Sequence, residues 1–218
     1  MDSPLYLYPN LNLNPEFIDF IGTNDKIVKY LDIPFQHISD PILKSMKRGH
    51  DSKFITELIQ NLKSKIQNLF LRTSVIVGFP GETDDDFNKL YNFIKEHEFD
   101  HLGVFEYSDE KMAASYNLKN KLDPKIINQR YHKLMSLQQE IISKKNMELI
   151  GMQFQAVVEG FDNNQFFGRI SGQAFEIDGI TYFENNNLAI GDFIDIKITS
   201  ANIYDFYAKK INLARVKL

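Results

Sequence analysis

The spacing of hydrophobic positions changes once along this chain, near residue 151. Before it, short apolar runs alternate with stretches in which apolar residues recur every three or four positions, the period of a helix that packs on one side. The apolar runs predict strands at 3–9, 28–36, 71–77 and 101–107. Strands that alternate with amphipathic helices indicate an α/β fold with a mostly parallel sheet, and we expect that sheet to continue in residues outside this chain.

A long helix is predicted from Asp123 to about Ile150, and Gly151 ends it. After Gly151 the spacing of hydrophobic positions falls to two residues. Asp178-Gly179 then lies between apolar runs at 174–177 and 180–183, which predicts a β-hairpin. Further short strands, predicted at 154–158, 193–198 and 203–208, indicate a small antiparallel barrel. The predicted domains are therefore 1–122, 123–150 (a connecting helix) and 151–218.

Composition restricts the class of protein. The 218 residues are 43% hydrophobic and 25% charged, which is ordinary for a soluble globular protein. The formal charge of −4 gives no general attraction to nucleic acid. No apolar run approaches the ~20 residues of a membrane span, and the first ten residues do not form a secretion signal, so we expect a cytoplasmic location. Cysteine is absent, so this chain offers no disulfide and no thiolate ligand.

The strand at 71–77 runs into the turn Gly78-Phe79-Pro80-Gly81-Glu82, and Thr83 then caps a helix. Ligands of parallel sheets bind at the carboxyl ends of strands, and glycines let the backbone approach a ligand closely. The alternative is a tight turn that only needs positive φ. Acidic residues 84–86 in the first helical turn are interpreted as partners of the helix dipole rather than as a metal site.

Several segments carry a resemblance to a known family. YLDIPFQHISDPILKSMKRGH, RTSVIVGFPGETDDDF and HLGVFEYSDE resemble the last strands of a radical SAM barrel, and more narrowly those of the RimO family. The region from Val157 through GRISGQAFEIDG to GDFIDIKITSANIYDF is similar to the TRAM domain of that family, a small β-barrel that docks the macromolecular substrate. The resemblance covers nearly the whole chain.

The resemblance implies a fold and an activity. The fold is a partial radical SAM barrel followed by a TRAM barrel. The activity is transfer of a methylthio group to the β-carbon of an aspartate in small-ribosomal-subunit protein twelve, with S-adenosylmethionine (SAM) and [4Fe-4S] clusters as cofactors. Clusters are held by cysteine thiolates, and this chain has none. We therefore expect a C-terminal portion of such an enzyme, without methylthiotransferase activity on its own.

The resemblance also implies cofactor-binding residues at the ends of neighbouring strands: Gln36, His37, Arg48, Gly78, Phe79, Pro80, Gly81 and Glu82. The main chain of the turn would read the adenine edge, with Phe79 or Pro80 on its face. His37 either contacts SAM or hydrogen-bonds its own loop. Arg48 either pairs with the SAM carboxylate or is a basic residue favourable at a helix C-terminus.

The substrate-facing candidates lie at two places. Tyr107 and Ser108 end the last strand and either line the substrate opening or close the barrel. Glu176 and Asp178 are expected surface acids of the barrel domain. The family loop after the last strand usually reads Y-S-x-E-E-G-T, and here Lys111 and Met112 replace its second glutamate and its glycine, which leaves the role of this loop open.

Two other functions compete with this one: a tRNA methylthiotransferase of the MiaB type, and a non-catalytic module whose barrel binds RNA. The segment Asp32–Ser39 fits RimO better than MiaB, where H-L-P-x-Q-S-G-S is expected. Residues 152–218 contain six lysines and arginines against eight aspartates and glutamates, a net charge of −2. RNA-binding domains are usually basic, so this balance favours a basic protein partner.

Overall fold

The computed structural model describes residues 5–10, 12–184 and 187–212. The chain divides into two compact units, Met1–Ile141 and Ile142–Leu218, and the division falls within one helix, α5 (Pro124–Glu148). Each unit has its own hydrophobic core. The domain bounds given above, with a barrel from residue 151, stay a prediction.

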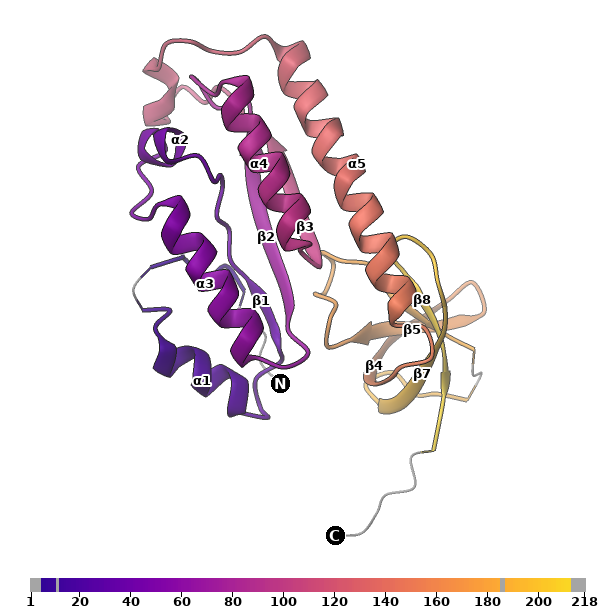
Figure 1. The fold of residues 1–218 in the computed structure, drawn as a ribbon. Helices are drawn as coiled ribbons and strands as arrows, with labels where there is room; N and C mark the ends of the chain where they lie inside the picture. The colour runs from indigo at the N-terminus through magenta and orange to yellow at the C-terminus, as the bar shows by residue number, and fades with distance from the viewer. Residues whose placement is uncertain (1–4, 11, 185–186, 213–218) are drawn as a thin grey trace. The chain divides into compact units, whose positions relative to one another are not determined.

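The first unit is built on a parallel sheet. In its described part the strand order is β1 (Tyr30–Asp32), β2 (Phe70–Val77) and β3 (His101–Glu106), as Figure 1 shows. Side chains along β2 alternate between buried and half-buried, because helices cover one face of the strand. Helix α1 (Pro15–Thr23) precedes β1. The other helical elements are α2 (Asp40–Ser45) and α3 (Ser52–Lys65) after β1, α4 (Asp84–His97) after β2, and η1 (Ala114–Asn117) and α5 after β3.

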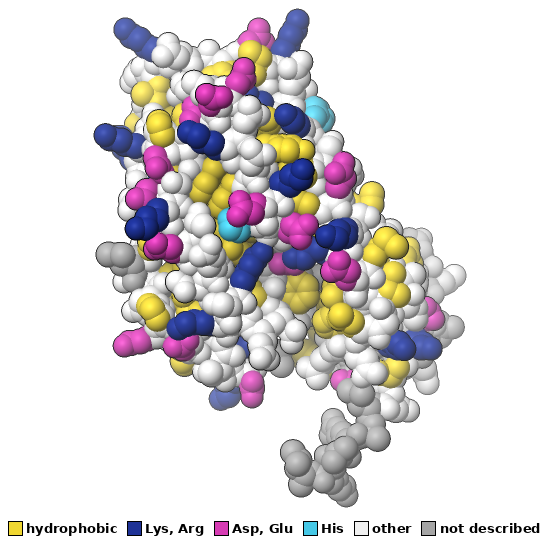
Figure 2. Space-filling model, in the orientation of Figure 1, with side chains coloured by type: hydrophobic (Ala, Val, Ile, Leu, Met, Phe, Trp, Pro, Cys, Tyr) yellow, Lys and Arg dark blue, Asp and Glu magenta, His cyan; other side chains and the backbone are white. Residues whose placement is uncertain are grey.

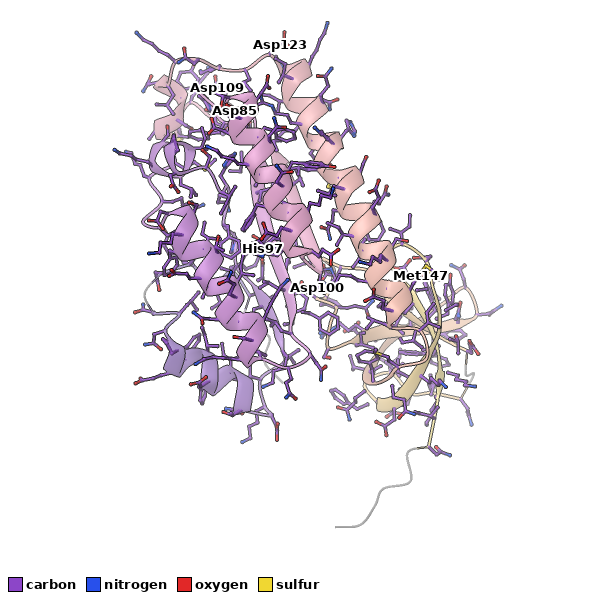
Figure 3. The ribbon with its side chains drawn as sticks, in the orientation of Figure 1. Asp85, His97, Asp100, Asp109, Asp123 and Met147 are labelled. Carbon is purple, nitrogen blue, oxygen red and sulfur yellow. The ribbon has the colours of Figure 1, made fainter. Side chains whose placement is uncertain are left out.

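The helices are amphipathic, as predicted. Leu58, Ile59 and Leu62 of α3 are buried, and so are Leu90 and Ile94 of α4. Over the face of the first unit visible in Figure 2, lysines and arginines are interspersed with aspartates and glutamates. Figure 3 places Asp85 in the first turn of α4 and His97 at its C-terminal end. The pKa of His97 is lowered by burial and by the nearby Lys63 charge, although Glu96 opposes this.

Two predicted strands differ from the structure. Residues 5–9 form no strand, because Tyr6 has a φ of +57° and turns the chain; residues 3 and 4 lie outside the described part. The predicted strand at 28–36 shortens to Tyr30–Asp32, and only a single bridge, Gln36 to Val75, continues the pairing. Pro34 has no N–H for a ladder, and the N–H of Phe35 donates to the Thr73 hydroxyl instead of to a carbonyl.

The second unit is a closed barrel. Its described strands are β4 (Gln153–Asp162), β5 (Gln165–Ile170), β6 (Thr181–Phe183), β7 (Phe193–Ala201) and β8 (Phe206–Lys210), in the order β4-β5-β6-β8-β7. Ile196, Phe183 and Ala208 lie in its core. The sequence predicts an antiparallel barrel, whereas in the structure β6 pairs parallel with β8.

The predicted hairpin at Asp178-Gly179 is wrong. Residues 174–177 form a turn rather than a strand, because the Ala174 carbonyl accepts the N–H groups of both Ile177 and Asp178. The observed hairpin joins β4 to β5 through Asn163 and Asn164, whose φ values of +47° and +63° match a tight two-residue turn. Asparagine tolerates this left-handed conformation, so the Asn-Asn pair was a usable signal in the sequence.

Candidate functional site

The turn after β2 has the geometry that its glycines predict. Gly78 and Gly81 have φ values of +78° and +88°, which favour glycine. A Cβ atom on Gly78 would lie 2.5 Å from the side chain of Ile127, so α5 packs directly against this position. Thr83 then caps α4 with a reciprocal capping box, in which Asp86 is the partner. The turn is therefore fixed at both ends.

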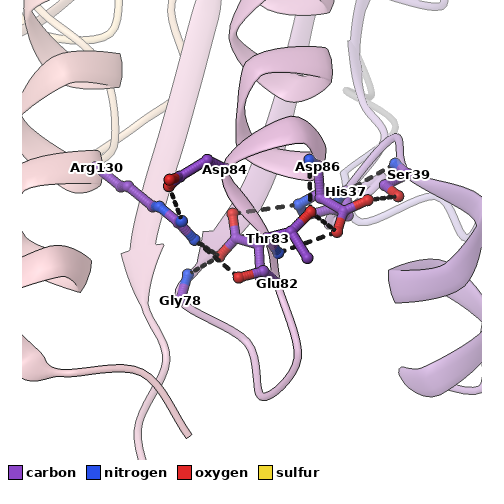
Figure 4. Close-up of polar contacts among 8 residues, drawn as sticks. All are labelled: His37, Ser39, Gly78, Glu82, Thr83, Asp84, Asp86 and Arg130. Carbon is purple, nitrogen blue, oxygen red and sulfur yellow. Dashed lines mark hydrogen bonds and ion pairs between the residues drawn. The ribbon is translucent and has the colours of Figure 1, made fainter. Parts of the chain in front are cut away.

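Glu82 holds the turn from inside. Its side chain is fully buried, and one carboxylate oxygen accepts the N–H of Gly78 (Figure 4). The same oxygen lies 3.2 Å from the guanidinium of Arg130, on α5. Arg130 also donates to the Glu82 carbonyl at 3.2 Å and to the Asp84 carboxylate at 2.6 Å. The carboxylate charge is thus buried but compensated, as buried charges must be.

His37 approaches Glu82 from the other side. It is fully buried, and its Nδ1 accepts the N–H of Ser39 at 2.9 Å. Nδ1 is therefore unprotonated, and the proton of a neutral ring is on Nε2. Nε2 lies 3.5 Å from the second carboxylate oxygen of Glu82 (Figure 4). His37 and Glu82 thus connect the loop after β1 to the turn after β2.

A second carboxylate, Asp86, completes the network. Ser39 occupies the N-cap position of α2, but its hydroxyl makes no capping bond and donates to Asp86 instead. Thr83 donates its N–H at 3.0 Å and its hydroxyl at 2.6 Å to the other Asp86 oxygen. Burial raises the pKa of Asp86, but these hydrogen bonds outweigh burial and the net pKa is lowered.

A cavity of about 500 Å³ lies where β2 ends. Arg48 and Phe79 are among its lining residues, with Tyr8, Ser45 and Ile76. A cavity of about 760 Å³ shares Tyr8 and Arg48 with it and reaches His50. Burial and the neighbouring Arg48 charge lower the pKa of His50, although the carbonyls of Phe35 and Pro9 oppose this. Both volumes lie in the range of small-molecule sites, about 300–1,000 Å³.

The structure brings some predicted cofactor residues together and not others. Arg48 and Phe79 line one cavity, and Tyr107 contacts Phe79 with ring centroids 5.4 Å apart. Gln36 is half-buried with a strained φ of +72°. His37 and Glu82 lie in the buried network and line neither cavity. Their contacts with a cofactor stay a prediction.

The remaining candidates are placed as follows. Pro80 is buried and Gly81 exposed. Ser108 is exposed and donates to Glu110, in a loop that also exposes Met112. Lys121 donates to Asp109 of this loop, and that hydrogen bond raises the pKa of Lys121. Glu176 and Asp178 belong to the second unit and are described below.

Sequence reasoning missed Arg130, Ser39 and Asp86. Arg130 is the charged residue on the buried face of α5 and lies between the apolar residues Ile127 and Leu134. A charged residue in such a stripe is a usable signal, because a buried arginine needs a carboxylate partner. Asp86 looked like its neighbours, and nothing in the sequence distinguishes it as the buried member of the acidic run.

Comparisons with known proteins agree with this architecture. The family model of the radical SAM superfamily matches residues 4–94, and that of the TRAM domain matches residues 150–211. Among the described residues, no helix combines the length and apolarity needed to cross a membrane.

Similar curated proteins carry the name ribosomal protein uS12 methylthiotransferase RimO. Those of Aquifex aeolicus, Clostridium novyi and Natranaerobius thermophilus are 39%, 42% and 41% identical, over 92%, 92% and 95% of this chain. The alignments cover 47%, 45% and 47% of the relatives, so the chain spans about half the length of the curated relatives it matches.

A similar solved structure is coproporphyrinogen III oxidase (HemN) from Escherichia coli, described as a radical SAM enzyme. Its TM-score is 0.51 at 19% identity, over 69% of this chain and 33% of HemN. This likeness concerns the fold alone.

Proposed function

This chain belongs to the RimO family, and from that premise we propose that it forms the SAM-turn and TRAM portion of a ribosomal-protein methylthiotransferase. The proposed reaction adds a methylthio group to the β-carbon of an aspartate in small-ribosomal-subunit protein twelve. The observation that carries the proposal is the cavity at the end of β2, which both Arg48 and Phe79 line.

The residues of this cavity suit SAM. Arg48 offers a planar guanidinium for the carboxylate of the ligand, and Phe79 offers an aromatic surface for its adenine. The buried contacts of Glu82 hold the Gly78 N–H and therefore the turn in position before the ligand binds, which lowers the cost of binding. Bound SAM supplies a carbon radical when it is reduced in enzymes of this superfamily.

The residues of this chain do not fit an iron–sulfur cluster. The sequence has no cysteine, and the described residues contain no group of three His, Asp or Glu side chains that could hold a metal ion. No step is therefore assigned to a cluster held by this chain. We expect this chain alone to lack methylthiotransferase activity.

The test compares two ligands that differ in one group. SAM carries a carboxylate, and 5′-methylthioadenosine has the same adenosine and sulfur without it. In calorimetric titrations, Arg48→Ala should weaken SAM binding about tenfold or more and leave methylthioadenosine binding unchanged. Lys44→Ala, an exposed neighbour outside the cavity, is the control. Equal losses for both ligands, or no SAM binding to the unaltered chain, would contradict the proposed pocket.

The proposed macromolecular partner is basic protein twelve rather than tRNA. The net charge of −2 over residues 152–218 attracts a lysine- and arginine-rich protein. A tRNA would meet a surface of its own sign and gain little from counterion release.

A further inference from the structure

The loop between β5 and β6 exposes three successive residues. Phe175 is 57% exposed, Ile177 is 39% exposed, and Glu176 between them is also exposed. The two residues before them, Gln173 and Ala174, are 3% and 7% exposed. Two large apolar side chains therefore face solvent on either side of a carboxylate, and we call residues 175–177 the loop tip.

The base of this loop is held rigidly. The Asp178 carboxylate accepts the N–H of Ala174 at 2.8 Å, and the Ala174 carbonyl accepts N–H groups from the other side of the turn. The Gln173 side-chain oxygen accepts the Ile170 N–H at 3.1 Å and the Thr181 hydroxyl at 2.7 Å. These hydrogen bonds join the base of the loop to both flanking strands and hold the backbone of the tip in one conformation.

The backbone at the tip adopts a costly conformation. Glu176 has a φ of +58°, in the left-handed region that L residues other than asparagine and aspartate seldom adopt. Such strain persists where the surroundings determine it and gathers at functional positions. Glu176 adopts this conformation between the exposed Phe175 and Ile177, and neither side chain is part of the barrel core.

Charge at the tip is not balanced within the described residues. Arg169 lies under Phe175, with its guanidinium 5.9 Å from the ring centroid, but it pairs with Glu159 at 2.6 Å. No ion pair of Glu176 is found in the described part of the chain. Phe193, 61% exposed, lies in the same sheet, where Val157 pairs with Phe193 on one side and with Arg169 on the other.

We propose that the loop tip is a docking site for a basic protein segment. A leucine-like side chain of the partner would pack against Phe175 and Ile177, and a lysine or arginine of the partner would pair with Glu176. A few large side chains that become buried on binding carry most of the binding energy at protein interfaces, and Phe175 is the largest exposed side chain of the tip. Because protein twelve is basic, the inference deepens the proposed function in its choice of partner chemistry, but it can be tested separately.

The test uses the intact chain and fluorescence anisotropy with three probes: a short peptide of lysine and leucine, the matching peptide of lysine and serine, and oligouridine. The lysine–leucine peptide should bind most tightly. Phe175→Ser should weaken the binding of this peptide about tenfold. The matched control is Phe161→Ser. Phe161 is 51% exposed and lies at the far end of β4, so its replacement should change the affinity for the peptide less than twofold.

The contribution of the Glu176 charge is tested by Glu176→Gln, which keeps the size of the side chain and the left-handed backbone conformation. It should weaken binding about threefold at low salt and less at high salt, whereas Glu184→Gln, exposed elsewhere in the barrel, should have no effect. Equal losses in Phe175→Ser and Phe161→Ser would overturn the docking site. Oligouridine binding that exceeds peptide binding and is lost in Phe175→Ser would overturn it in favour of nucleic acid.

Protein twelve as a fourth probe separates the two claims. If it binds the unaltered chain and the Phe175→Ser variant equally, the docking site is wrong and the proposed substrate survives. If it does not bind while the lysine–leucine peptide binds through Phe175, the docking site survives and the proposed substrate is wrong.

Discussion

Replacing Arg130 by methionine should destabilise the first unit strongly. Methionine keeps most of the volume of the side chain, so the change removes the charge and little packing. It leaves the Glu82 carboxylate, fully buried, with the Gly78 N–H and the more distant His37 as its remaining partners. Asp84 is 91% exposed in its side chain and loses little, because water replaces the guanidinium.

The magnitude follows from burial. Arg130 and Glu82 side chains are 7% and 0% exposed, so solvent screens the pair weakly. Removing one partner of such a pair costs about 3–5 kcal/mol, because an uncompensated charge stays buried. The double variant Arg130→Met/Glu82→Gln removes that charge and keeps an acceptor for the Gly78 N–H. It should therefore be about 1–3 kcal/mol more stable than Arg130→Met alone.

Guanidinium unfolding followed by circular dichroism measures the free energy, and NMR amide exchange of Gly78 reports the turn itself, since the two units need not unfold together. Lys65→Met is the control, because it breaks an exposed pair with Asp19 at 2.9 Å and should cost less than about 1 kcal/mol. If Arg130→Met matched this control, or if the double variant were the less stable of the two, the buried-charge reasoning would be refuted.

Four further predictions concern other parts of the chain. Gly78→Ala should lower the unfolding free energy by about 2 kcal/mol or more, because of its φ of +78° and the contact with Ile127; an unchanged denaturation midpoint would contradict this. The pKa of Asp86 is lowered on folding, so the stabilisation that its carboxylate contributes is present above the ordinary pKa of 3.8 and is lost as pH falls through the lower folded pKa. Asp86→Asn should therefore flatten the acid side of the plot of unfolding free energy against pH, and an unaltered plot would contradict this. Anaerobic iron–sulfur reconstitution should give no stoichiometric cluster, whereas about four irons per chain would show thiolate-free ligation that we do not expect. Residues 151–218 expressed alone should give the dispersed NMR spectrum of a folded barrel; a poorly dispersed spectrum, typical of an unfolded chain, would place the domain boundary elsewhere.

Periodicity and turn chemistry were enough to predict the main framework. The strand at 71–77, the Thr83 cap and the buried faces of α3 and α4 follow from local pattern, because they depend on neighbours within a few residues. The change of period near residue 151 predicts an α/β part and a β part, whereas the two compact units of the structure divide within α5, between Ile141 and Ile142.

The errors came from tertiary contacts. Asp178-Gly179 has hairpin chemistry, yet the Asp178 side chain bonds to Ala174 and stabilises a loop instead. Ser39 has capping chemistry, yet Asp86, 47 residues away, takes its hydroxyl. The partners of Glu82 come from the loop after β1 and from α5, and no local pattern brings these three segments together.

The sharpest test of the proposed function is a paired titration of the intact chain with small-ribosomal-subunit protein twelve and with an unmodified tRNA, at low and at physiological salt. The account predicts binding to the protein that weakens with salt, and weak binding to tRNA, because residues 152–218 carry a net charge of −2. Glu176→Lys should reduce the protein binding; Asp178 is a poor choice for reversal, since its carboxylate holds the loop. Tighter binding to tRNA with a steep salt dependence would contradict the assignment and move the chain to the tRNA-modifying branch.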